Sequence, residues 1–254
     1  MNRTIALFFL FILIHFSVSA AKVIHIFVSL CDNKYQGIVP VPAKIGNGQD
    51  PFNNLYWGCG YGVKTFFKNS SEWKMVKEIK NPTKEILERC IFKHKTTGTY
   101  LVADAYDGME IKKCTVDYLE ALSGNNIQKI KIDSTLTIEA GGGSQLLGYV
   151  GHDGLMDFTL DNTFTKKNEQ KRESIILACY SKSYFKDYVK SCGAEPLLWS
   201  SHLMSPEAYT LEAAIKGWLL NEDAQSVRKR AATAYDKYLH CGIKGATNLL
   251  VTGW

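Results

Sequence analysis

The sequence lacks several patterns that would each indicate a particular function. Its 30 lysines and arginines exceed its 25 aspartates and glutamates only modestly, and no stripe of basic residues is present. We therefore expect no nucleic-acid partner. The motif Gly-x-Ser-x-Gly of α/β-type serine hydrolases does not occur, and there is no internal repeat. The stretch 141–144, Gly-Gly-Gly-Ser, has neither the spacing of a dinucleotide-binding loop nor the lysine of a phosphate-binding loop. No nucleotide or other cofactor is expected.

What the sequence does contain is enough apolar residues to bury a full core. Of the 254 residues, 46% are hydrophobic and 22% are charged, which is typical of a globular protein and excludes a fibrous or wholly disordered chain. The length allows one large domain or two small ones. Because strands and helices alternate through most of the chain, we predict a single α/β domain over residues 21–254, with a helical C-terminal part.

The first twenty residues have the pattern of a secretory signal peptide. Arg3 gives a positive start, residues 5–16 are mostly apolar, and Val18-Ser19-Ala20 ends in small residues. A retained membrane anchor is the alternative, but the apolar run is too short, because a spanning helix needs about twenty apolar residues. We predict cleavage after Ala20 and a secreted or periplasmic protein that has no membrane span after signal removal.

Five short apolar runs predict the strands of one sheet. Apolar residues lie on both faces of these runs, as in parallel strands that are covered by helices on two sides. The predicted strands are residues 22–30, 99–106, 145–151, 174–178 and 196–199. Helices are predicted within residues 53–68, over 115–122 and over 182–192. A further helix is predicted to begin at 205, and a last helix to extend through 238. We expect a mostly parallel sheet with helices on both faces and a ligand site at the carboxyl ends of the strands.

One segment allows two interpretations. Asn81-Pro82 has the pattern of a helix start, with an N-cap residue followed by proline in the first turn. Residues 91–94 are equally typical of a strand in a hairpin.

Two consecutive predicted strands end in side chains with a shared chemistry. His152 follows the strand 145–151, and Cys179 follows the strand 174–178. The carboxyl ends of parallel strands lie at one edge of a sheet, so we expect both side chains in one crevice. An imidazole can keep a thiol ionised, or take its proton as the sulfur attacks a carbonyl carbon. Backbone N–H groups from the turn after His152 and from Cys179 would meet the resulting oxyanion.

These strand ends resemble those of the caspase-like cysteine peptidases, the group of caspases, metacaspases, gingipains, legumains and clostripain. Its members have an apolar strand that ends in His-Gly, followed by an apolar run that ends in a small residue and Cys. Residues 146–154 and 175–179 correspond to these segments, and Tyr180-Ser181 is similar to the residues after the nucleophile in some bacterial members. The resemblance implies a caspase-like three-layer sandwich and a thiol protease with a peptide or protein substrate. Cys179 is then the nucleophile and His152 the general base.

The sequence departs from the family pattern at one position. The family's histidine is followed at once by glycine, whereas this chain reads His152-Asp153-Gly154. The oxyanion donor beside Cys179 is therefore expected to be the N–H of Asp153 or Gly154. Asp153 is also a candidate to hold the imidazole or to select a basic group on the substrate.

The residues after the fifth predicted strand are candidates for substrate binding. Ser200, Ser201 and His202 are expected to line the groove, with an ordinary polar loop as the alternative. A metal held by His152, Asp153 and His202 is a weaker hypothesis, because their spacing matches no common ligand pattern. We predict no metal.

The cysteines leave their pairing open. There are seven, an odd number, at positions 31, 59, 90, 114, 179, 192 and 241. An exported chain can form disulfides, but none of the spacings is C-x-x-C, and buried unpaired thiols are an equal alternative.

Two functions compete with hydrolysis. His152 could be a structural histidine and Cys179 a buried thiol, in which case the chain is a non-catalytic caspase-like protein that binds a peptide or protein partner. An exported protein held by disulfides is the third interpretation, and it predicts Cys179 in a bridge.

Overall fold

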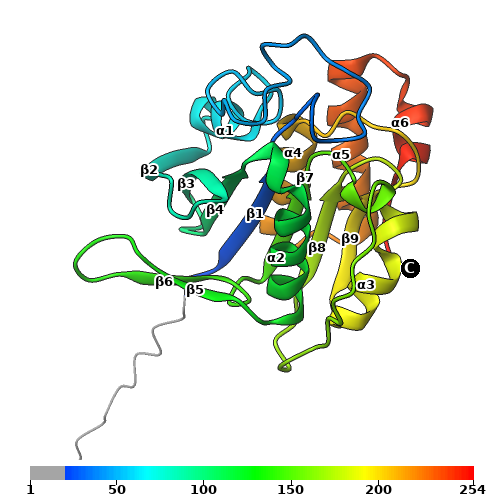
Figure 1. The fold of residues 1–254 in the computed structure, drawn as a ribbon. Coiled ribbons are helices and arrows are strands. Elements are labelled where there is room, and N and C mark those ends of the chain that lie inside the picture. Colours follow the sequence, from blue (N-terminus) through cyan, green and yellow to red (C-terminus); the bar gives the residue numbers. More distant parts are fainter. Residues whose placement is uncertain (1–20) are drawn as a thin grey trace, which may run out of the picture.

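A central eight-stranded sheet organises the protein (Figure 1). The computed structural model describes residues 21–254, so the predicted signal peptide lies outside the described residues. The sheet has the order β10-β9-β8-β7-β1-β4-β3-β2. Its strands are β1 (Val23–Ser29), β2 (Trp73–Lys80), β3 (Ile86–His94), β4 (Tyr100–Tyr106), β7 (Leu146–Val150), β8 (Glu173–Leu177), β9 (Glu195–Ser200) and β10 (Leu250–Val251).

The five central strands confirm the predicted parallel arrangement. β4, β1, β7, β8 and β9 each run parallel to their neighbours within this group, whereas β2, β3 and β10 are antiparallel, so the sheet as a whole is mixed. β1, β4 and β7 are buried at every residue. This explains why their sequences are continuously apolar rather than alternating.

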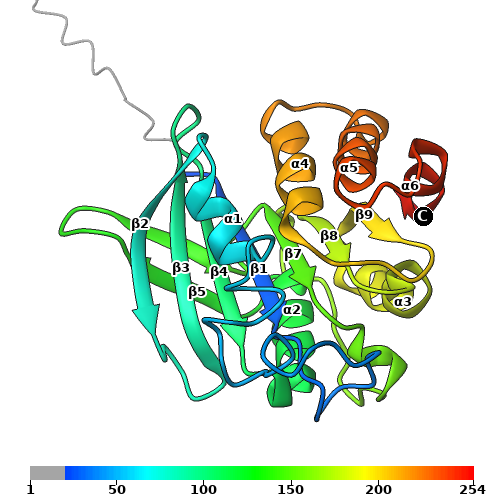
Figure 2. The ribbon, with the colours of Figure 1, turned by 90° about the horizontal axis from the view of Figure 1, so that it is seen from above.

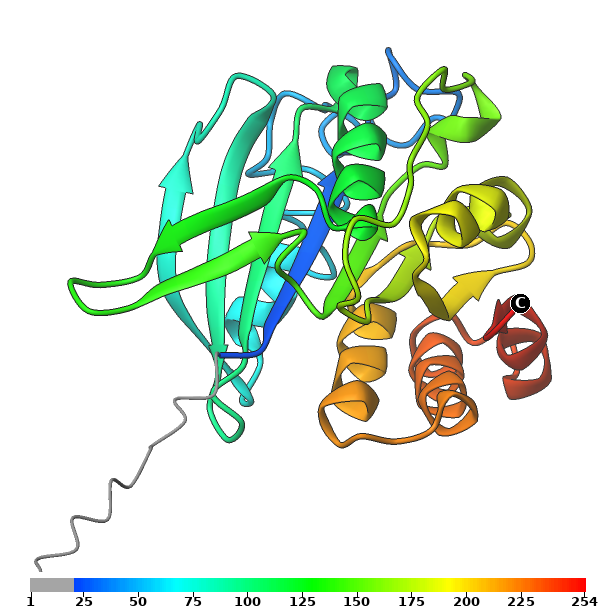
Figure 3. The same cartoon turned by 90° about the horizontal axis from the view of Figure 1, so that it is seen from below.

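Helices cover both faces of the sheet, which also confirms the prediction (Figures 2 and 3). α1 (Val63–Asn69), α4 (Ala208–Leu219) and α5 (Ala224–Leu239) pack on one face with Ile24 and Ile26. α2 (Ile111–Ser123) and α3 (Ser181–Cys192) pack on the other face with Phe27, because successive residues of a strand point to opposite sides. α6 (Ile243–Leu249) leads into β10. No helix within residues 21–254 has the length and apolar composition that a membrane crossing requires.

A separate hairpin covers the remainder of the second face. β5 (Ile127–Lys131) and β6 (Thr137–Gly141) pair antiparallel, and their Ile130 and Ile138 pack against Val102 of β4. Figure 3 shows this hairpin projecting across the sheet beside α2. The hairpin was not predicted, although residues 129–132 and 136–140 alternate between polar and apolar side chains as a strand with one buried face does.

The helix interpretation of Asn81-Pro82 is wrong. Asn81 lies in the turn between β2 and β3 with φ 47°, and its N–H bonds to the carbonyl of Leu87. The hairpin alternative is confirmed, since residues 91–94 belong to β3. The local cap signal is outweighed by pairing of β3 with strands on both sides. The other helix predictions hold with shifted ends: α1 occupies only the end of the range 53–68, and α2 begins at Ile111.

Candidate functional site

Loops at the carboxyl ends of four parallel strands enclose a cavity of about 440 Å³. In the lining, residues 37–41 and 55–56 follow β1, Gly151, His152 and Met156 follow β7, Cys179 follows β8, and residues 203–207 follow β9. The connection that leaves β1 carries α1 on one face, whereas the connection that enters β7 carries α2 on the other. β1 and β7 are therefore neighbouring strands whose connections lie on opposite faces of the sheet. In open α/β sheets, ligands bind at the carboxyl ends of such a pair of strands.

Cys179 lies at the point where β8 turns into α3. The next residue, Tyr180, has φ 51°, a left-handed conformation that turns the chain sharply. The Cys179 sulfur accepts a hydrogen bond from the N–H of Met204 at 3.4 Å and lies 3.6 Å from the Met204 carbonyl oxygen. Burial raises the pKa of the Cys179 thiol, and the Met204 bond only partly opposes this. The resting thiol is therefore protonated and needs a base before it can act as a nucleophile.

His152 lies at the end of the neighbouring strand and lines the same cavity as Cys179. The turn before it needs glycine: Gly151 has φ 144°, and a Cβ there would lie 2.6 Å from the Ser29 carbonyl oxygen. The imidazole is almost buried, and its Nε2 lies 2.7 Å from Asp157 Oδ2. Within residues 21–254 no group hydrogen-bonds Nδ1, and no hydrogen bond joins His152 to the Cys179 sulfur. The structure thus brings both predicted residues to one cavity, with Nδ1 unoccupied.

Asp153 and Gly154 lie in the buried turn behind His152. Asp153 is fully buried, and its Oδ1 accepts the N–H of Leu155 at 3.0 Å, while its Oδ2 has no partner in the described part of the chain. Burial raises the pKa of Asp153 to about 7. Gly154 begins the short 3₁₀ segment η2 (Gly154–Met156), where a Cβ would meet the Phe158 ring at 2.6 Å. Neither residue is among those that line the cavity.

Ser200, Ser201 and His202 also lie outside the cavity lining, although the next five residues belong to it. The Ser200 hydroxyl is buried and donates to the carbonyl of Ala178, and it accepts the N–H of Ser181 at 3.2 Å. The Ser201 hydroxyl is 2.8 Å from His202 Nδ1 and bonds to carbonyls of α6. These contacts give the two serines a structural role in joining β9 to its neighbours.

The cavity wall contributed by the loop after β1 was not predicted. This loop has no periodicity, so nothing in the sequence indicated that it folds back over the strand ends. Most lining residues are apolar, and two of them, Val39 and Leu203, are 85% and 64% exposed at the rim. The one carboxylate of the lining is Glu207, whose pKa is raised by burial and which accepts the Tyr209 hydroxyl at 2.7 Å. No lysine or arginine of the described chain lines the cavity.

All seven cysteines lie within the described residues and are free thiols, so Cys179 is not in a bridge. Cys241 is exposed, Cys59 and Cys179 are intermediate, and the others are buried. The unpaired alternative for the cysteines therefore describes this structure, and Cys241 provides an exposed thiol for comparison with Cys179.

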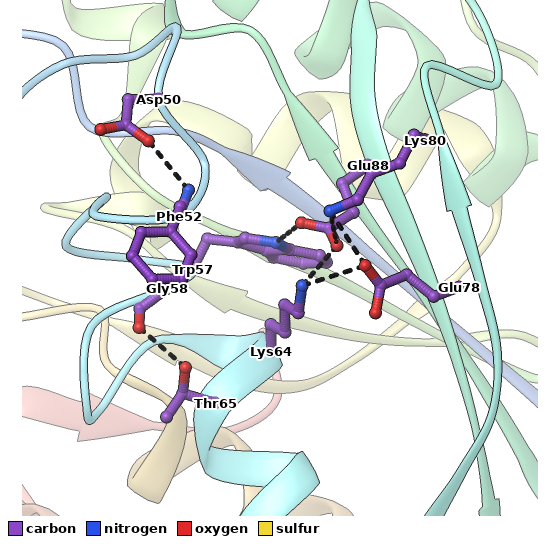
Figure 4. A network of polar contacts seen from close by, with 9 residues as sticks. All are labelled: Asp50, Phe52, Trp57, Gly58, Lys64, Thr65, Glu78, Lys80 and Glu88. Atoms are coloured by element: carbon purple, nitrogen blue, oxygen red, sulfur yellow. Dashed lines mark hydrogen bonds and ion pairs between the residues drawn. The ribbon is translucent and has the colours of Figure 1, made fainter.

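A second polar cluster has the spacing of metal ligands but is already neutralised (Figure 4). Glu78, Glu88 and Cys90 come close together on β2 and β3. Lys64 and Lys80 lie 2.5 Å and 2.6 Å from Glu88 Oε1, and the Trp57 indole donates to Oε2 at 2.8 Å. Burial raises the pKa of Cys90 to about 12, which opposes the thiolate that a metal would need. A cation would have to displace two lysines, so this cluster is best described as an ion-pair network.

Comparisons with protein-family models, with curated proteins and with solved structures found no match to this chain. A protonated thiol and an imidazole with one unoccupied nitrogen, beside an apolar cavity, are the parts of a nucleophilic site for a carbonyl compound.

Proposed function

We propose that this protein is an exported cysteine hydrolase of caspase-like type that cleaves a peptide or amide bond. The observation that carries the proposal is the convergence of Cys179 and His152, from adjacent parallel strands, on one cavity at the carboxyl edge of the sheet. The order β9-β8-β7-β1-β4, with His152 after β7 and Cys179 after β8, supports the caspase-like assignment. The N-terminal pattern of residues 1–20 is the basis for export.

The proposed reaction has two stages. His152 Nδ1 takes the proton of the Cys179 thiol while the sulfur forms a bond to the substrate carbonyl carbon. The carbon–nitrogen bond then breaks, the amine leaves with the proton from the imidazole, and an acyl thioester remains. Water attacks this thioester, His152 accepts the water proton and returns it to the sulfur, and the acid product leaves.

The oxyanion of each tetrahedral intermediate needs N–H donors. Of the three expected donors, Asp153 and Gly154 do not line the cavity, whereas Cys179 does. This favours the N–H of Cys179, which belongs to the same residue as the reacting sulfur, as the oxyanion donor.

Selective labelling tests this proposal. Intact protein is treated with iodoacetamide at about pH 7, and the labelling rate of each cysteine is measured by peptide mass spectrometry. Cys179 is expected to react faster than the more exposed Cys241 despite its protonated resting state, because His152 takes the thiol proton as the sulfur attacks, and His152→Gln should slow Cys179 alone. Cys179→Ala should also abolish hydrolysis of a fluorogenic peptide library. Labelling of Cys179 at or below the rate of Cys241 would contradict the proposal.

A non-catalytic binding protein is the second candidate. It is favoured by the raised pKa of Cys179 and by the absence, in the described chain, of a bond between thiol and imidazole. In that case peptides would bind the apolar cavity without turnover, and Cys179 would be labelled no faster than Cys241.

A further inference from the structure

We propose that Asp157 is a positioning residue, which fixes the proton of His152 on Nε2 and holds the imidazole against the loop that follows β1. The inference rests on the proposed function, since it adds Asp157 to the proposed pair of Cys179 and His152 as a third group. Asp157 was not predicted from the sequence, where Asp153 was the candidate to hold the imidazole.

The geometry singles out Asp157 among the carboxylates near His152. Its Oδ2 lies 2.7 Å from His152 Nε2, and the same oxygen accepts the N–H of Gly37 at 2.9 Å. Its own N–H bonds to the Gly154 carbonyl at 2.9 Å, which fixes the backbone at the end of η2. Asp153, in contrast, bonds to Leu155. Asp157 thus joins the loop after β7 to the loop after β1, and both loops line the cavity.

The chemistry of a carboxylate determines which nitrogen carries the proton. An ionised carboxylate only accepts hydrogen bonds, so Nε2 of the imidazole must be the donor in this contact. The neutral ring then has its lone pair on Nδ1, the nitrogen without a partner in the described chain. When Nδ1 takes the Cys179 proton, the ring becomes a cation, and Asp157 at 2.7 Å stabilises that cation.

Gly37 provides a second way to disturb the same carboxylate. A Cβ at Gly37 would lie 2.4 Å from Asp157 Oδ1, so an added methyl group must displace Asp157. Gly37→Ala leaves the charge of Asp157 and the side chains of His152 and Cys179 intact. An effect shared by Gly37→Ala and Asp157→Asn would therefore arise from the position of the carboxylate.

The matched control is Asp161→Asn. Asp161 is exposed, lies four residues after Asp157, and makes no hydrogen bond or ion pair in the described chain. The substitution removes the same charge through the same chemical change, so general electrostatic effects on the loop appear in both variants.

The experiment measures Cys179 alkylation by iodoacetamide, with Cys241 as internal reference, and records long-range ¹H–¹⁵N spectra of the histidine rings. Asp157→Asn should slow Cys179 by about 10- to 100-fold, the range found when a metal-bound histidine loses its orienting partner. Gly37→Ala should slow it in the same direction, Asp157→Glu should recover part of the rate, and Asp161→Asn should have no effect. The His152 spectrum, assigned with His152→Gln, should show the Nε2–H tautomer in the native protein and a mixture in Asp157→Asn.

Two outcomes separate the hypotheses. If Asp157→Asn keeps both the native rate and the Nε2–H tautomer while His152→Gln is slow, the positioning role is overturned and the Cys–His hydrolase survives. If His152→Gln itself reacts at the native rate, the proposed function fails. The ring spectrum needs no turnover, so it tests Asp157 in either case, and Asp157→Glu and Gly37→Ala replace Asp157→Asn if that variant does not fold.

Discussion

A buried ion pair inside the sheet yields a quantitative prediction about stability. Asp104 of β4 is fully buried and accepts two hydrogen bonds from Arg89 of β3, both at 2.6 Å, and one from His25 of β1 at 3.0 Å. Arg89 also donates to Gln128 of β5 at 2.6 Å, and His25 Nδ1 accepts the N–H of Gly141 at 2.9 Å. These contacts fasten the β5–β6 hairpin to the sheet.

Removing Arg89 should leave a buried carboxylate with only the imidazole as a donor. Breaking such a pair costs about 3–5 kcal/mol, a large part of the stability of a typical domain. With a urea m-value of about 3 kcal/mol/M, Arg89→Met should lower the unfolding midpoint by about 1–2 M. Methionine keeps an apolar stem of similar length, so the loss reports the charge rather than a cavity.

The pH dependence of this loss gives a sharper test. Burial acts to raise the pKa of Asp104, but the interactions with His25 and Arg89 outweigh it and hold the pKa below its ordinary value. The native protein therefore loses this contribution only as the pH falls through that lowered pKa. In Arg89→Met the pKa of Asp104 should rise above the unfolded value, so the variant gains stability as the pH falls. The gap between the two proteins should narrow from about pH 7 to about pH 4.

Urea titrations followed by circular dichroism at both pH values measure the gap. The double variant Arg89→Met/Asp104→Asn has no buried carboxylate without its arginine partner. It should recover most of the lost free energy of unfolding at pH 7. A cost below about 1 kcal/mol for Arg89→Met, or a gap that does not depend on pH, would refute the reasoning.

Three further changes have defined outcomes. Burial raises the pKa of Asp153 to about 7, above its unfolded value. The native protein should therefore lose stability as the pH rises from about 4 to about 7, by roughly 4 kcal/mol at most. Asp153→Asn should flatten that slope in thermal unfolding scans, and an unchanged slope would show that another group causes it. Gly151→Ala should lower Tm, because its Cβ would meet the Ser29 carbonyl at a φ that alanine rarely adopts, and an unchanged Tm would contradict this. Glu88→Gln should destabilise the protein by about 1–3 kcal/mol in denaturant titrations, since a buried indole and two lysines lose a charged acceptor. A neutral result would mean that water replaces it.

The central strands could be predicted because burial on both faces leaves a local record in the sequence. The runs at 145–151 and 174–178 are apolar without alternation, and the structure places β7 and β8 there. Helix α3 could also be predicted, since its apolar spacing ends at Gly193, which caps the helix with φ 69°. In these segments the local preference and the tertiary environment agree.

The edge of the sheet could not be predicted in the same way. β2 is buried at Trp73 and then alternates between half-buried and exposed residues, so three lysines and one glutamate interrupt its apolar pattern. The attachment of the β5–β6 hairpin depends on contacts such as Arg89 to Gln128, between segments far apart in the chain. Where such distant contacts decide the structure, a local signal such as the helix-start pattern of Asn81-Pro82 predicts the wrong element.

The candidate site likewise has residues that could be predicted from the sequence and one that could not. That His152 and Cys179 approach one cavity follows from a rule about strand ends, which requires only that two consecutive strands be recognised and be parallel. The partner of the imidazole follows from no such rule. Asp157 is near His152 in sequence, but its second contact, Gly37, lies 120 positions away on a loop without periodicity. Sequence patterns therefore identify groups that regular strands carry, whereas the groups that orient them depend on how irregular loops close over the strand ends, and only coordinates supply that.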